Sequence, residues 1–112
     1  MLTISDVMKM KGRKDIDGIL RALKDPDIGV RAEAALSLGE LDDRKAVEPL
    51  ISTLQYDSDP YVRSLAAKAL GELGDPRALD PLRNSIMSDT MEVSMEAGKA
   101  ASLLAAKIAT GK

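Results

Sequence analysis

The sequence contains no cysteine, histidine, tryptophan or phenylalanine, and only two tyrosines among its 112 residues. Without cysteine it has neither a disulfide framework nor a thiol nucleophile, an absence that fits a cytoplasmic protein. Without histidine it lacks the commonest general base and metal ligand. No glycine-rich phosphate-binding motif is present, and no serine has an evident base partner. We therefore predict that the chain is not an enzyme and has no catalytic residue, metal site or cofactor.

Long apolar runs and a strong net charge are also missing. No stretch of 18 apolar residues occurs, which predicts no membrane-spanning helix, and the first residues lack the apolar core of a signal peptide. The net charge of −2 is unevenly spread: residues 1–14 and 97–112 each carry +3, whereas residues 15–96 carry −8. An acidic body repels phosphate, which argues against nucleic acid as the main partner despite the basic ends.

What the sequence does contain is an internal repeat. Val30–Leu50 reads VRAEAALSLGELDDRKAVEPL, and 32 residues later Val62–Leu82 reads VRSLAAKALGELGDPRALDPL, with 12 of 21 positions identical. Chance at ordinary residue frequencies would give about one or two matches. Each copy of the repeat divides into two segments whose apolar residues recur at steps of three and four, which predicts a pair of amphipathic helices. Leucine and alanine dominate these segments, and both favour helix.

The pattern divides the chain, a single domain over residues 1–112, into a short first helix and three helix pairs. We predict the short helix at residues 5–11 and the repeats at about 15–42, 44–74 and 75–109. A helix pair of this length cannot bury its apolar face alone, but stacked neighbours share a continuous core. The predicted fold is therefore an all-α, right-handed α-solenoid of about three helix pairs.

The two aligned segments resemble HEAT repeats, and more closely the short HEAT-like type named after phycobilisome lyases. In HEAT repeats an aspartate in the turn between the helices and an arginine early in the second helix tie neighbouring repeats together. The resemblance thus implies a structural ladder, made here of Asp25, Arg31, Asp57 and Arg63. Ser94 replaces the third arginine, so we expect the ladder to end at the third repeat.

The resemblance also bears on function. One HEAT-like hydroxylase holds two irons through repeated His-Glu pairs, and this chain has no histidine. The expected function is a non-catalytic scaffold module that binds an unidentified protein or peptide on its concave face. The alternative is an accessory subunit of a lyase-type or other enzyme complex.

Candidate contact residues lie on the second helix of each pair, because in HEAT-type stacks these helices line the concave side of the solenoid. Positions there that do not face the core differ between the copies, as in a recognition surface. Six of them are predicted to contact a partner: Leu36, Tyr61, Leu65, Lys68, Met95 and Lys99. Tyrosine and methionine are enriched at interfaces. The alternative is that these are ordinary scattered exposed residues.

The last predicted helix raises a separate question. Residues 97–109 read AGKAASLLAAKIA and are nearly all apolar, whereas the end of a solenoid needs a polar outer face. Two interpretations remain open. The chain is either an end-to-end homodimer through this helix or a monomer in which the helix is a mostly buried cap.

Overall fold

The computed structural model describes residues 1–111, which form α-helices and two short 3-10 turns with no strand in that range. The α-helices are α1 (Ile4–Gly12), α2 (Ile16–Ala22), α3 (Ile28–Leu41), α4 (Val47–Tyr56), α5 (Pro60–Leu73), α6 (Leu79–Ser88) and α7 (Met91–Ala109). The 3-10 turns η1 (Arg44–Ala46) and η2 (Pro76–Ala78) precede α4 and α6. None of these helices is both long and apolar enough to cross a membrane.

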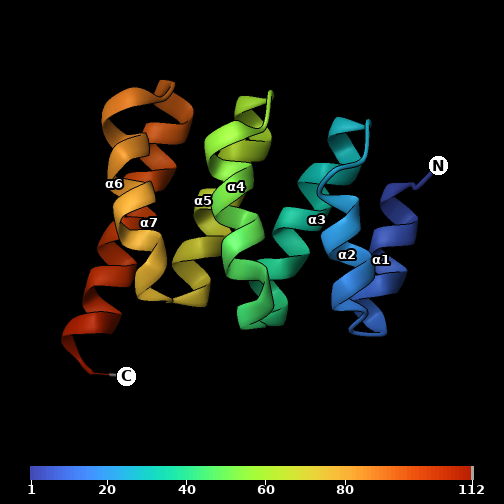
Figure 1. Cartoon of the computed structure of the whole chain (residues 1–112), viewed down its shortest axis with the longest axis horizontal. Helices are drawn as coiled ribbons and strands as arrows, with labels where there is room; N and C mark the ends of the chain where they lie inside the picture. Colours follow the sequence, from blue (N-terminus) through green and yellow to red (C-terminus); the bar gives the residue numbers. More distant parts are fainter. Residues whose placement is uncertain (112) are drawn as a thin grey trace.

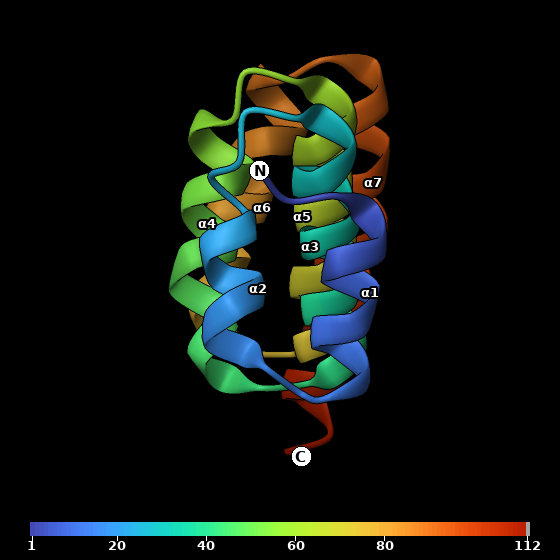
Figure 2. The same ribbon diagram turned by 90° about the vertical axis from the view of Figure 1, so that its right-hand side faces the viewer.

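The helices stand side by side in two layers (Figures 1 and 2). Helices α2, α4 and α6 form one layer, termed the first-helix layer, and α1, α3, α5 and α7 form the second-helix layer. Within the second-helix layer, α5 packs between α3 and α7, and α1 packs on α3. Successive helix pairs therefore stack along the long axis of the molecule, and the predicted all-α solenoid is confirmed.

Capping side chains explain where α1, α3, α5 and α7 begin. The Asp27 carboxylate accepts the N–H of Val30 at the start of α3 (3.0 Å), and an aspartate or threonine holds the same place before α5 and α7. Helix α1 begins one residue before its predicted start, because Thr3 and Asp6 accept each other's backbone N–H in a capping box. Short polar residues in the turns thus set the register of each helix pair.

Small residues set the spacing between helices of the second-helix layer. A Cβ atom added at Gly39 would lie 2.9 Å from the Cα of Ala69 in α5, and one added at Gly71 would lie 2.9 Å from the Cα of Ala100 in α7. Both glycines therefore sit where two helix backbones approach too closely for a side chain. Five alanines of the same layer are fully buried: Ala34, Ala35, Ala66, Ala67 and Ala97.

Helix α7 covers one end of the core and is anchored near its C-terminal end. Lys107 Nζ donates hydrogen bonds to the carbonyl oxygens of Glu72 (2.8 Å) and Gly71 (3.4 Å), which belong to the last turn of α5. A lysine in this place satisfies carbonyls that have no partner within the helix. Large apolar residues of α6 and α7 are nevertheless exposed: Met87, Met91, Met95, Leu103 and Ile108.

Candidate functional site

Arg31 of α3 joins two neighbouring helix pairs through their turns. Its Nε and Nη2 atoms donate to the two carboxylate oxygens of Asp57 at 2.8 and 3.2 Å. Its Nη1 atom donates to the carbonyl oxygens of Asp25 (2.9 Å) and Pro26 (3.1 Å). The Arg31 and Asp57 side chains are only 12% and 6% exposed. One guanidinium group therefore holds its own turn by the backbone and the next turn by a bidentate ion pair.

Arg63 of α5 repeats this geometry one helix pair further along. Its Nε and Nη2 atoms donate to Asp89 at 3.0 and 2.9 Å, and its Nη1 atom donates to the carbonyl oxygen of Asp57 at 2.7 Å. The hydrogen bonds to the Asp89 carboxylate raise the pKa of Arg63, as those to Asp57 raise the pKa of Arg31. Burial alone would raise the pKa of Asp89, but hydrogen bonds from Arg63 and from the Thr90 N–H hold it below its ordinary value.

The two ends of the ladder of arginines and aspartates differ from its middle. Ser94, at the third arginine position, donates its hydroxyl to the carbonyl oxygen of Ile86 at 2.8 Å. The Asp25 carboxylate accepts the N–H of Asp27, and the Arg31 side chain binds the backbone carbonyl of Asp25 but not its carboxylate. Asp25 therefore joins the ladder through its backbone carbonyl and not through its carboxylate. Arg31 and Arg63 each bind the aspartate in the turn of the following repeat. Helix α1, which precedes the turn that contains Asp25, has no arginine that could bind the Asp25 carboxylate.

Three of the six predicted contact residues share a shallow groove on the second-helix layer. This α3/α5 groove has a volume of about 170 Å³. It is lined by Ile4, Gly29, Ala32, Glu33, Leu36, Tyr61 and Leu65. The Tyr61 side chain is half exposed at its rim, whereas Leu65 packs partly against the core. Lys68, Met95 and Lys99 are exposed but lie outside the lining of the groove.

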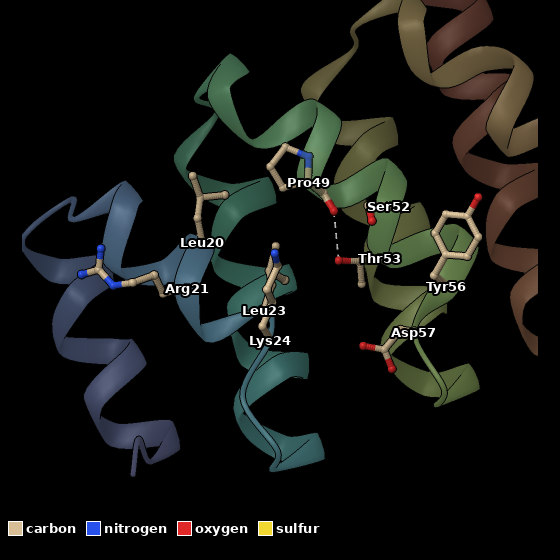
Figure 3. A pocket seen from close by; sticks show the side chains of 9 residues that line it. All are labelled: Leu20, Arg21, Leu23, Lys24, Pro49, Ser52, Thr53, Tyr56 and Asp57. Atoms are coloured by element: carbon tan, nitrogen blue, oxygen red, sulfur yellow. Dashed lines mark hydrogen bonds between the residues drawn. The ribbon is translucent and has the colours of Figure 1, made fainter.

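A larger groove, termed the α2/α4 groove, lies in the first-helix layer, and we did not predict it from the sequence (Figure 3). Its volume is about 500 Å³. It is lined by Leu20, Arg21, Leu23, Lys24, Pro49, Ser52, Thr53, Tyr56 and Asp57. A signal for it exists in the spacing of the repeat. One residue separates Leu23 from Asp25, but two separate Leu54 from Asp57, so α2 ends short of the last turn of α4.

Comparison with known proteins identifies the family. A family model for HEAT repeats matches residues 16–102, from the start of α2 into α7. The chain belongs to the HEAT-repeat family. The resemblance seen in the repeated segments is thereby confirmed. No curated protein sequence matches this HEAT-repeat chain.

Among solved structures, human deoxyhypusine hydroxylase in complex with glycerol is similar to this HEAT-repeat chain, with a TM-score of 0.85 and 28% sequence identity. The match covers 96% of this chain and 38% of the hydroxylase chain, so this chain spans well under half of the length of that enzyme. The prediction that the chain is not an enzyme is contradicted by this similarity. The absence of histidine and cysteine was too narrow a criterion, because closely similar repeats form part of an enzyme. Within residues 1–111, no three histidine, cysteine, aspartate or glutamate side chains are grouped as a metal site would need.

Proposed function

We propose that this HEAT-repeat chain binds a protein or peptide segment through the α3/α5 groove. The observation that supports the proposal most is that Leu36, Tyr61 and Leu65 surround one depression although they come from two different repeats. Each of them differs from the residue at the same position of the other repeat, whereas the buried residues are nearly the same in both. Positions that do not stack the repeats are the ones left for recognition.

The shape of the groove favours an apolar anchor from the partner. Tyr61, Leu65 and Lys68 follow one another at steps of four and three along α5, so they lie on one face of that helix. Tyrosine contributes a large contact area and a hydroxyl group, a combination enriched at the centre of interfaces. The bound segment would therefore place an apolar side chain against Tyr61 and a polar group toward Lys68.

The test is a comparison of partners captured by wild-type protein and by a Tyr61→Ala/Leu36→Ala variant. We expect the variant to lose partners that the wild-type protein retains, with a loss of affinity of about tenfold or more. Met87→Ala, which removes an exposed apolar side chain of α6, is the matched control and should retain them. Identical partner lists for wild type and double variant, with unchanged thermal unfolding, would mean that the groove is not the binding site.

A second candidate function is a place within an enzyme assembly, and the similarity to part of the hydroxylase favours it. In that case an enzyme subunit should copurify with the chain at constant stoichiometry through successive columns. A chain that elutes free of any enzyme subunit from its native source would speak against this candidate.

A further inference from the structure

We propose a second binding site on the opposite layer of the molecule: the α2/α4 groove binds an extended peptide in which an apolar residue adjoins an acidic residue. The groove and the α3/α5 groove share no lining residue. The site therefore stands apart from the function proposed above, and either can fail without the other.

The groove exists because the first repeat is one residue shorter than the second at this point. Helix α4 packs along α6, whereas α2 packs against the turn η1 that precedes α4. The last turn of α4 therefore extends past the end of α2 and leaves Tyr56 80% exposed. Figure 3 shows Tyr56 and Pro49 on the α4 side of the gap and Leu20 and Leu23 on the α2 side. The volume of about 500 Å³ lies in the range of known ligand pockets.

The charged side chains of the lining that form no ion pair are both positive. Arg21 and Lys24 are exposed, and neither takes part in an ion pair within residues 1–111. The carboxylate of Asp57 is already neutralised by Arg31 and is almost inaccessible. Although the body of the chain is acidic, charges further away than about 10 Å are largely screened at ordinary salt. Local charge complementarity therefore selects an anionic ligand.

The lining combines this charge with an apolar surface, which points to a peptide. Leu20, Leu23, Pro49 and Tyr56 offer contact to an apolar side chain. The Thr53 hydroxyl already donates its hydrogen bond to the carbonyl oxygen of Pro49 (3.0 Å). Lys24 follows the end of α2 and lies beside Leu23 at the gap, whereas the Arg21 guanidinium extends toward the other side of α2 (Figure 3). An apolar side chain placed against Tyr56 leaves the neighbouring carboxylate on the side of the Lys24 ammonium group, which can donate a charge-assisted hydrogen bond to it.

The test uses two short synthetic peptides with leucine at every second position, one with glutamate and the other with lysine between the leucines. Binding is measured by fluorescence anisotropy, and its location by backbone amide chemical shifts. We expect the glutamate peptide to bind with a Kd below about 1 mM and at least about tenfold more tightly than the lysine peptide. The largest shifts should fall on the end of α2 and the last turn of α4.

Variants localise the effect. Arg21→Glu/Lys24→Glu and, separately, Tyr56→Ala should each weaken binding by about tenfold or more. Arg13→Glu/Arg83→Glu causes the same change in net charge at exposed arginines outside the groove and should bind as wild type. The Tyr61→Ala/Leu36→Ala variant should also bind the glutamate peptide as wild type does. This result would distinguish binding in the α2/α4 groove from binding in the α3/α5 groove.

Several results would overturn the proposal. One such result is the absence of saturable binding up to about 1 mM peptide. Another is equal affinity for the two peptides, and a third is unaltered peptide binding by the Arg21→Glu/Lys24→Glu variant. Chemical shifts confined to the α3/α5 groove would also overturn it and would instead support the function proposed for that groove.

Discussion

At the scale of single residues, two glycines in helix interiors should respond in opposite ways to the same substitution. Gly71→Ala would place a Cβ atom 2.9 Å from the Cα of Ala100, so α5 and α7 must move apart, and we expect a loss of about 1–3 kcal/mol. Gly98→Ala meets no atom within 4 Å and should stabilise α7 by about 0.4–1 kcal/mol. Urea unfolding measures both. A Gly71→Ala variant as stable as wild type would show that the close approach of the two helices is not required.

At the scale of elements, Asp75 holds two successive turns together. It begins η2 by accepting the N–H of Arg77, and its carboxylate also accepts hydrogen bonds from the guanidinium groups of Arg77 and of Arg44 in η1. The hydrogen bonds from Arg77 lower the pKa of this nearly buried carboxyl from its ordinary 3.8 to about 2, against the effect of burial. The charged form of Asp75 is thus bound more tightly in the folded protein than in the unfolded chain.

This shift predicts a pH-dependent cost for Asp75→Asn. Because the pKa is lower in the folded state, the stabilisation is complete above 3.8 and is lost as the pH falls through about 2. The shift is equivalent to about 2 kcal/mol, and the half-exposed Arg77 reduces it to about 1–2 kcal/mol at neutral pH. Urea unfolding of wild type and Asp75→Asn should therefore differ at pH 7 and converge near pH 2.

The control for this variant is Asp43→Asn. Asp43 holds the same place before η1 and accepts the N–H of Lys45 at 2.8 Å, but takes part in none of the ion pairs found in residues 1–111. We expect the asparagine to keep the cap, with a change within about 0.5 kcal/mol. A difference between wild type and Asp75→Asn that stays constant from pH 7 to pH 2 would contradict the proposed role of the charge.

At the scale of the whole molecule, the sequence predicts the stack better than it predicts the surface. Residues that repeat, such as Val30 and Val62, recur because every repeat needs the same core, so their periodicity is visible without a structure. Surface shape depends on how neighbouring repeats differ. The missing residue between Leu23 and Asp25 is visible in the sequence, but that it opens a groove beside α4 follows only from the packing of α2.

The direction of the ion pairs is another property of the stack. A single repeat contains both an aspartate and an arginine, and the resemblance to HEAT repeats implies that they tie neighbouring repeats together, but not which arginine binds which aspartate. The structure pairs Arg31 with Asp57 and Arg63 with Asp89, because each arginine extends toward the turn of the next repeat.

The stack also predicts how the protein opens. Helix α5 packs against α3, α4 and α7 and buries eight of its residues, whereas α1 packs against α2 and α3 and buries only Val7. In a solenoid each unit is stabilised mainly by its neighbours, so a unit with contacts on both sides opens at a higher free energy than one at an end. Native-state hydrogen exchange followed by mass spectrometry should therefore find the slowest amides in α5 and the fastest helical amides in α1. Equal protection of α1 and α5 would mean instead that the helices open only together, as one cooperative unit, and that the contacts between repeats outweigh the difference between the end and the middle of the stack.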